Sequence, residues 1–335
     1  MKIGIIGPPQ SGKTTIFKIL LQDANISSDI GIFKVMDQRL EKLSEVFSSK
    51  KKTYPEWTFL DMGVLSAFTS KDYSKLQDID LFICVAGAFF SENPKKDLEG
   101  HITDIILSDL EAIQNRISRI EKERMKIKTD VEGELKLLKK CQDFLSEGKL
   151  LYKIGLTKDE KKLFSGFEFI TLKSMLVAIN IQEETEEDKI KELEQYCSSM
   201  GLSYIRFFGK TESEFLELDK IEQEQFSKEL GGSYNLRENM SRLISKELNL
   251  IIFFTAGEKE TRGWHLEKGL PIIEAAGKIH SDIKRGFIRA EVFNYEDFIK
   301  CEANAHKVRE AGLLKIEGKE YVVKDGDIIN IRFNI

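Results

Sequence analysis

The sequence is poor in proline, cysteine and tryptophan, since its 335 residues include only 5, 4 and 2 of them. So few prolines exclude a long proline-rich linker. The four cysteines lie far apart in the chain, which excludes a paired-cysteine motif of the zinc or redox type. Isolated cysteines of this kind are typical of reduced, partly buried thiols, and they favour a cytoplasmic protein.

Long apolar runs and an excess of charge are missing as well. No run reaches the roughly 18 apolar residues that a membrane-spanning helix needs, and the apolar run over residues 3–6 is too short for a signal sequence. The 56 acidic residues nearly balance the 51 basic ones. This balance excludes a strongly basic nucleic-acid coat and gives no overall attraction to membranes, although a local basic patch is compatible with it. We therefore expect a soluble cytoplasmic protein with no membrane partner.

What the sequence does contain is an alternation of short β-branched runs with helical patterns. This alternation is typical of an α/β fold in which helices cover a parallel sheet. Its predicted strands are residues 3–6, 57–60, 81–85, 172–179 and 204–208, and its first predicted helix is residues 13–21. From about residue 250 the pattern predicts a small mixed sheet instead, with strands over 251–254, 320–323 and 328–335 and a helix over 296–311.

A block from residue 107 to residue 168 has a different pattern. Apolar residues recur there at three- and four-residue steps, namely Leu110, Ile113, Ile117 and Ile120, and then Leu135, Leu138 and Leu145. Charged residues fill most other positions, so the spacing predicts an antiparallel helical hairpin or short coiled coil with a turn over 126–133. We therefore predict an α/β domain formed by residues 1–106 and 169–248, a helical insertion of residues 107–168, and a C-terminal domain of residues 249–335.

The strongest chemical motif follows the first predicted strand and opens the first predicted helix. Residues 7–14 match the phosphate-binding pattern G-x-x-x-x-G-K-[ST] in full. Glycines let backbone N–H groups turn toward phosphate oxygens, and the helix N-terminus adds partial positive charge. Lys13 is expected to stabilise charge on the β- and γ-phosphates, and Thr14 to ligate Mg²⁺. The predicted nucleotide contacts in this segment are Gly7, Pro8, Pro9, Gln10, Ser11, Gly12, Lys13, Thr14 and Thr15.

The phosphate-binding motif does not by itself identify the nucleotide. Ring-forming ATPases need a strand that ends in Asp-Glu, a pair that residues 81–85 and 59–61 lack. GTPases need Asp-x-x-Gly, whereas Asp61-Met62-Gly63 is one residue shorter, so Asp61 stays only a candidate for holding Mg²⁺. Where GTPases carry Asn-Lys-x-Asp, this sequence has Asn180-x-x-Glu183, a weak pattern that an exposed polar loop would explain equally well.

Taken together, these motifs resemble the YchF/Obg-like ATPase family of P-loop proteins. The order of the parts is similar: a phosphate-binding loop, a helical hairpin insertion, Asn-x-x-Glu, and a C-terminal TGS domain of ubiquitin-like β-grasp form. The resemblance covers essentially the whole chain. Its most specific stretches are residues 254–257, 262–264, 275–280, 285–292 and 321–333, and residues 35–40 are similar to the family's segment after the first switch.

The resemblance implies a translation-associated protein that binds Mg²⁺ and ATP in preference to GTP and hydrolyses the nucleotide slowly. It implies that Asn180 and Glu183 read the base, together with a loop that contains Gly209 and Lys210. It also places a hydrophobic residue, Val64 or Leu65, where related GTPases carry a water-orienting glutamine.

The same resemblance implies a ribosome or structured RNA as the partner, bound through the hairpin and the TGS domain. The basic cluster Lys284, Arg285 and Arg289 is the candidate for phosphate contacts, which would weaken as salt rises. A solvated charged surface would explain these residues about as well. We expect a monomer.

The chain departs from the family pattern in both switch segments. The glycine-rich second switch is replaced by residues 66–72, and the first switch, residues 25–31, is short. Ser27 and Ser28 are candidates for its Mg²⁺ ligand only by position. Because the phosphate loop is intact while both γ-phosphate sensors are altered, the alternative function is a nucleotide-binding scaffold without efficient hydrolysis.

Overall fold

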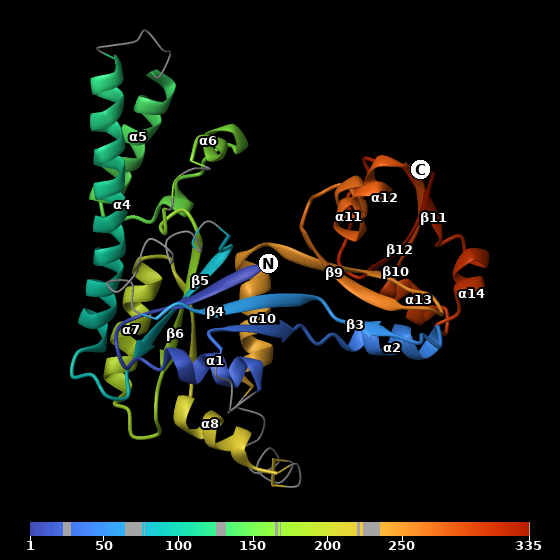
Figure 1. Ribbon diagram of the computed structural model, residues 1–335. Helices are drawn as coiled ribbons and strands as arrows, with labels where there is room; N and C mark the ends of the chain where they lie inside the picture. Colours follow the sequence, from blue (N-terminus) through green and yellow to red (C-terminus); the bar gives the residue numbers. More distant parts are fainter. Residues whose placement is uncertain are drawn as a thin grey trace. The chain divides into compact units, whose positions relative to one another are not determined.

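The computed structural model describes residues 1–22, 28–63, 76, 78–124, 132–164, 167, 169–219, 222–223 and 235–334. The chain forms two compact units, each with its own sheet (Figure 1). The first unit contains Met1–Phe33 and Thr58–Met240, and the second contains Lys34–Trp57 and Ser241–Ile335. No helix within the described ranges is both long and apolar enough to cross a membrane.

The first unit is built on a six-stranded sheet with the order β2-β4-β1-β5-β6-β7. Its strands are β1 (Lys2–Ile6), β2 (Ile30–Lys34), β4 (Glu56–Asp61), β5 (Leu81–Gly87), β6 (Ser174–Asn180) and β7 (Ser203–Phe207). Strand β1 pairs in parallel with β4 and β5, and β6 pairs in parallel with β5 and β7. Every residue of β5 is buried, as in sheets covered on both faces. The predicted α/β fold with a parallel sheet is confirmed.

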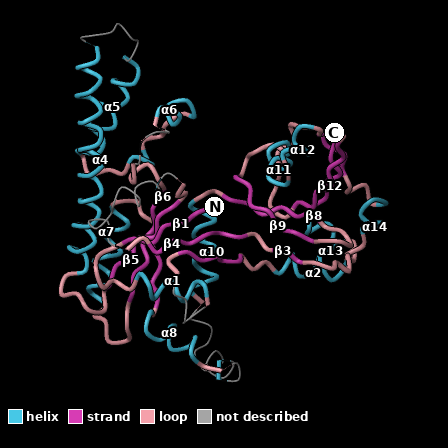
Figure 2. The backbone as a smooth tube through the Cα atoms, viewed as in Figure 1, coloured by secondary structure: helices cyan, strands magenta, loops and turns pink. Residues whose placement is uncertain are grey.

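Helices surround this sheet, and α1, α4 and α7 pack against its strands (Figure 2). The helices of this unit are α1 (Lys13–Leu21), α4 (Pro94–Arg124), α5 (Glu132–Ser146), α6 (Lys158–Leu163), α7 (Glu187–Ser199) and α8 (Gly209–Glu217), with a short 3₁₀ turn η2 (Leu151–Lys153). Helix α10 (Leu236–Glu247) begins in this unit and continues into the second from Ser241. Helices α5 and α7 bury an apolar stripe, as amphipathic helices on a sheet do.

Helices α4 and α5 lie side by side, as the apolar spacing predicts. Ile113 and Ile120 of α4 and Leu138 and Cys141 of α5 are buried in one core with the sheet residues. On the surface, the Arg116 guanidinium donates two hydrogen bonds, of 2.7 and 3.0 Å, to the Glu134 carboxylate. Most of the predicted turn between the two helices, namely residues 126–131, lies outside the described residues.

The second unit has a mixed sheet with the order β11-β10-β12-β8-β9-β3. Its strands are β3 (Lys52–Thr53), β8 (Leu250–Thr255), β9 (Thr261–Glu267), β10 (Phe287–Asn294), β11 (Lys315–Glu317) and β12 (Asp327–Phe333), and its helices are α2 (Gln38–Val46), α11 (Ile272–Ile279), α12 (Ser281–Arg285), α13 (Tyr295–Lys300) and α14 (Ala305–Glu310). Strand β12 pairs in parallel with β8 and antiparallel with β10, which makes the sheet mixed as predicted.

Two local predictions for the second unit are wrong. The helix predicted over 296–311 is split into α13 and α14, because Glu302 and Ala303 have φ angles of 55°, outside the helical region. The Asn304 side chain then caps α14 by accepting hydrogen bonds from the N–H groups of His306 and Lys307. The strand predicted over 320–323 is reduced to a single bridge between Pro271 and Val322.

Residues 34–57 join the second unit, an association that the sequence analysis did not anticipate. The Arg39 guanidinium forms ion pairs with Asp37, at 2.8 Å, and with Asp325, at 2.5 Å, and it lies 5.3 Å from the centre of the Phe254 ring. Strand β3 also pairs in parallel with β9. These contacts fasten α2 and β3 to residues that follow them by more than two hundred positions.

Candidate functional site

The phosphate-binding loop joins β1 to α1 at the point in the sheet where the strand order reverses, the usual ligand site of parallel sheets. Gly7 and Gly12 have φ angles of 146° and 99°. A Cβ on Gly7 would lie 2.4 Å from the Val85 carbonyl oxygen, and a Cβ on Gly12 would lie 2.2 Å from Nδ2 of Asn180. Only glycine therefore fits at either position.

Lys13 and Ser11 give this loop its electrostatic character. Nζ of Lys13 donates hydrogen bonds to the carbonyl oxygens of Gly7, at 3.1 Å, and Pro8, at 2.7 Å. Burial lowers the pKa of Lys13, and the nearby Asp61 carboxylate opposes this shift. The buried hydroxyl of Ser11 has no hydrogen-bond partner among the described residues. With the N-terminus of α1 beside them, a buried cation and an unused donor form a site for an anion such as phosphate.

The two residues predicted to hold a metal lie together. The Thr14 hydroxyl donates a 2.8 Å hydrogen bond to Oδ2 of Asp61, and the Gly63 N–H donates to Oδ1 of Asp61 at 3.3 Å. A hydroxyl and a carboxylate are hard oxygen ligands, which suit Mg²⁺. The described residues contain no cluster of three or more His, Cys, Asp or Glu that could hold a metal ion. The pair therefore fits Mg²⁺ that takes its other ligands from phosphate and water.

Asn180, at the end of β6, connects three segments around the site. Its Nδ2 donates to the Ser11 carbonyl oxygen at 3.1 Å, and its Oδ1 accepts from the Gly209 N–H at 3.1 Å. The side chain is only 4% exposed. Because both ends of the amide are used, Asn180 fixes the phosphate loop relative to the start of α8.

A cavity of about 280 Å³ lies beside Asn180. It is lined by Thr15, Phe89, Asn180, Gln182, Gly209, Lys210, Ser213, Glu214 and Glu217. Thr15, Asn180, Gly209 and Lys210 were predicted nucleotide contacts, and the structure brings them together here. Glu183, the other predicted base contact, is exposed and is not among the lining residues.

Five residues that line the cavity were not predicted from the sequence, namely Phe89, Gln182, Ser213, Glu214 and Glu217. In α8 the signal was available, because Lys210, Ser213, Glu214 and Glu217 are spaced as one face of a helix. Nothing in the sequence pattern marks Phe89, which follows β5 in an apolar run.

Glu212 fixes the segment that begins α8. Its carboxylate accepts hydrogen bonds from the N–H groups of Phe208, at 3.3 Å, and Leu236, at 3.4 Å. Burial raises the pKa of Glu212 to about 7. The carboxylate thus links two backbone segments next to the cavity without lining it.

Several predicted switch residues cannot be placed. Val64 and Leu65, residues 66–72, and Ser27 lie outside the described residues. Ser28 is described, and its hydroxyl accepts a 3.1 Å hydrogen bond from the Ile30 N–H.

The predicted basic cluster lies in the second unit and is partly neutralised. Lys284 donates two hydrogen bonds of 2.8 Å to the Glu274 carboxylate, and Arg285 is paired with Asp282. Arg289 is exposed, without an ion pair among the described residues.

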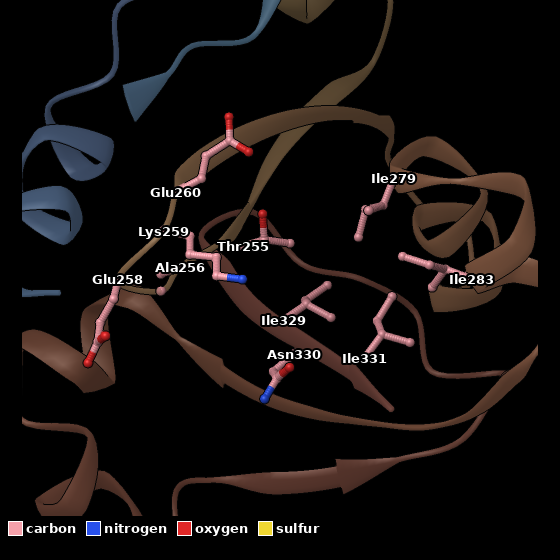
Figure 3. Close-up of a pocket in the computed structure, with 11 residues that line it drawn as sticks. Thr255, Ala256, Glu258, Lys259, Glu260, Ile279, Ile283, Ile329, Asn330 and Ile331 are labelled. Atoms are coloured by element: carbon pink, nitrogen blue, oxygen red, sulfur yellow. The ribbon is translucent and has the colours of Figure 1, made fainter. Parts of the chain in front are cut away.

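The second unit has a cavity of its own, of about 540 Å³ (Figure 3). Ile279 and Ile283, from α11 and the neighbouring α12, and Ile329 and Ile331, from β12, lie along it. The loop 256–260 forms its other side and carries Glu258, Lys259 and Glu260. The lining of this cavity combines four isoleucines with the charged residues Glu258, Lys259 and Glu260. The helix N-terminus and the pair of Thr14 and Asp61 that suit phosphate and Mg²⁺ lie in the first unit.

Comparisons with known proteins identify sequence relatives of this chain. A sequence model of the family YchF-GTPase_C, described as a protein of unknown function (DUF933), matches residues 250–334. The "Ribosome-binding ATPase YchF" of Buchnera aphidicola subsp. Schizaphis graminum is 35% identical over 360 aligned residues, covering 100% of this chain and 99% of that protein. The protein of the same name from Bacillus subtilis is 33% identical, with 99% of each chain covered.

Solved structures show the same fold. The YchF GTPase of Schizosaccharomyces pombe superposes with a TM-score of 0.86 at 22% identity, over 99% of this chain and 97% of that chain. A GTP binding protein from Pyrococcus horikoshii OT3 superposes with a TM-score of 0.64 at 18% identity, with both chains covered in full.

Proposed function

The chain belongs to the YchF family, and from this premise we propose that it binds ATP with Mg²⁺, hydrolyses it slowly and associates with the ribosome. The phosphate loop, residues 7–14, holds the phosphates in this proposal, and the cavity beside Asn180 holds the base. The relatives' name, ribosome-binding ATPase, supports both the nucleotide and the partner.

One observation carries the nucleotide part of the proposal. Asn180 hydrogen-bonds to the phosphate loop through Ser11 and to the α8 loop through Gly209, and it also lines the cavity. An anion site and a cavity that share one fixed side chain suit a ligand with phosphates at one end and a flat ring at the other. A nucleoside triphosphate has this form.

The hydrolytic mechanism depends on charge stabilisation. Lys13, which donates to the carbonyls of Gly7 and Pro8, exchanges these partners for phosphate oxygens when a nucleotide enters. Lys13 and the loop N–H groups then stabilise the negative charge that develops as water attacks the γ-phosphate. Thr14 and Asp61 are the residues that would hold Mg²⁺, which supplies further neutralisation of charge on the β- and γ-phosphates.

The segment formed by residues 61–63 supports the alternative function, a scaffold that binds nucleotide without hydrolysing it. In Asp-x-x-Gly proteins the glycine N–H contacts the γ-phosphate. In this chain the shortened motif lets the Gly63 N–H donate to Asp61 instead, at 3.3 Å. We expect the intrinsic rate to be low for this reason and to rise when a partner rearranges the segment.

The ribosome part of the proposal concerns residues outside the nucleotide site. We propose that the hairpin, residues 107–168, and the TGS domain, residues 249–335, contact ribosomal RNA, with exposed Arg289 as the first candidate. The remaining residues, 1–106 and 169–248, would form the nucleotide-binding domain, except that 34–57 join the second unit. A monomer working in the cytoplasm is part of this proposal.

The experiment is titration calorimetry of the purified chain with ATP and GTP in Mg²⁺, combined with single-turnover hydrolysis with and without ribosomes. We expect Lys13→Ala to lower ATP affinity by about 100-fold, because a charge-assisted contact is lost. Lys18→Ala, on the same helix but outside the loop, is the matched control and should bind normally.

The outcomes separate the alternatives. Unchanged ATP binding by Lys13→Ala would refute the proposed site. Binding by the parent chain without phosphate release, even with ribosomes, would favour the scaffold. GTP affinity about tenfold above ATP affinity would overturn the choice of base.

A further inference from the structure

Two neighbouring side chains in the loop after β6 differ in burial and in whether they line the cavity. Gln182 is half-buried and lines the cavity beside Asn180, whereas Glu183 is exposed and does not line it. Both follow Asn180 closely, so sequence spacing alone cannot decide which of them faces a ligand.

The backbone at Gln182 is fixed on both sides. The Gln182 N–H donates to the Thr185 hydroxyl at 2.8 Å, and the Gln182 carbonyl accepts from the Thr185 N–H at 3.1 Å. The preceding Ile181 N–H donates to the Phe207 carbonyl oxygen at 3.0 Å, and its side chain is 4% exposed. The loop is thus anchored, while the side-chain amide of Gln182 makes no hydrogen bond to any described residue.

The other residues that line the cavity influence which ligand the Gln182 amide can bind. Phe89 offers an aromatic ring, which favours a flat partner. Glu214 and Glu217, on the face of α8, offer carboxylates that accept hydrogen bonds but cannot donate them when ionised. Lys210 and Ser213 line the same cavity and can donate hydrogen bonds. The walls therefore serve donors and acceptors of a ring alike, and the Gln182 amide is left as the group that can distinguish one ring from another.

We propose that Gln182, and not Glu183, selects adenine in this cavity; the inference rests on the proposed nucleotide function. A glutamine amide has one donor and one acceptor side by side. Adenine presents the complementary pair at its N6 amine and N7, whereas guanine presents two acceptors there, O6 and N7. One amide can therefore satisfy adenine but leaves one guanine acceptor unmatched.

The test compares the affinities for ATP, GTP and inosine triphosphate, which carries O6 in place of the N6 amine. For Gln182→Leu we expect ATP affinity to fall by about tenfold, while the affinities for the other two change by less than about twofold. Because the three ligands share the same triphosphate and sugar, a general loosening of the loop would lower all three affinities equally and overturn the proposal.

Two variants of the same loop complete the design. Glu184→Gln, next to the site and exposed, is the matched control, for which the three affinities should stay in their parental ratio. If Glu183→Gln shifts the ratio of ATP to GTP affinity and Gln182→Leu does not, the proposal is wrong. If the parent chain binds none of the three ligands, the proposed function fails; if it binds ATP but Gln182→Leu keeps the parental ratio, only this inference fails.

Discussion

The phosphate loop and the aromatic group in the second unit both bury polar atoms without hydrogen-bond partners, but in different surroundings. In the loop, the Ser11 hydroxyl is buried beside Lys13 and the start of α1. In the second unit, the two ring nitrogens of His265 are buried, and its ring stacks on Trp57 at 5.2 Å. The Arg262 guanidinium likewise lies 4.0 Å from the centre of the Trp264 ring.

This difference tells us under which conditions a buried polar atom without a hydrogen-bond partner indicates a ligand site. Aromatic stacking and cation–π contact offset part of the cost of burying His265 and Arg262, so these atoms need no ligand to explain them. The Ser11 hydroxyl lies in a loop whose charge and glycine geometry already suit an anion, and a phosphate would satisfy it. An unpaired atom thus argues for a site only where the surrounding groups favour the same ligand.

The substitution Gly12→Ala is expected to have the largest effect, and it tests whether the phosphate loop is the phosphate site. The added Cβ would lie 2.2 Å from Nδ2 of Asn180, at a φ of 99° that alanine rarely adopts. Because the loop and Asn180 must both move, we expect ATP affinity to fall by about 100-fold in calorimetry. Gly100→Ala, in helix α4, meets no atom within 4 Å and is the control, with unchanged affinity. Normal ATP binding by Gly12→Ala would mean that the loop is not the phosphate site.

A change of intermediate size is expected from His265→Phe in the second unit. Burial lowers the pKa of His265 from 6.5 to about 4. As the pH falls from 6.5 to 4, the unfolded chain takes up a proton that the folded chain refuses, so stability is lost across this window. Phenylalanine keeps the ring against Trp57 and removes this loss.

The measurement is urea unfolding of the parent and His265→Phe at several pH values. The free energies of unfolding should be similar near pH 7, and the variant should be more stable by on the order of 2 kcal/mol near pH 4. His101, whose pKa is also lowered to about 4 by burial, affects both proteins equally. A difference between the two proteins that does not grow with acid would show that His265 titrates normally, and the stacking argument would fail.

The parts predicted correctly from the sequence depend on neighbours along the chain. The turn from β1 into α1 follows from the eight consecutive residues 7–14, and the buried strand β5 follows from one apolar run. The pairing of Thr14 with Asp61 was also within reach, since parallel strands bring their carboxyl ends to one edge of the sheet.

The parts missed depend on distant residues or on side-chain direction. Residues 34–57 join the second unit through contacts such as Arg39 with Asp325, and no local pattern encodes a pair so far apart. The break between α13 and α14 depends on positive φ angles at Glu302 and Ala303, two residue types that ordinarily continue a helix. Side-chain direction in the loop after β6 decides that Gln182 lines the cavity, and residue spacing does not report it.

The smallest effect is expected for Ser11→Ala. This substitution tests directly whether the unpaired Ser11 hydroxyl serves a ligand or only the fold. Removing a buried hydroxyl that has no partner among the described residues should change the free energy of unfolding by less than about 0.5 kcal/mol. ATP affinity should nevertheless fall by about tenfold, because a hydrogen bond to a charged phosphate is lost. Chemical unfolding without nucleotide and calorimetry with ATP give the two numbers on one sample. If Ser11→Ala loses stability but binds ATP normally, the hydroxyl serves the fold and not a ligand. The unpaired polar atoms of Ser11 and His265 would then both be explained without a ligand.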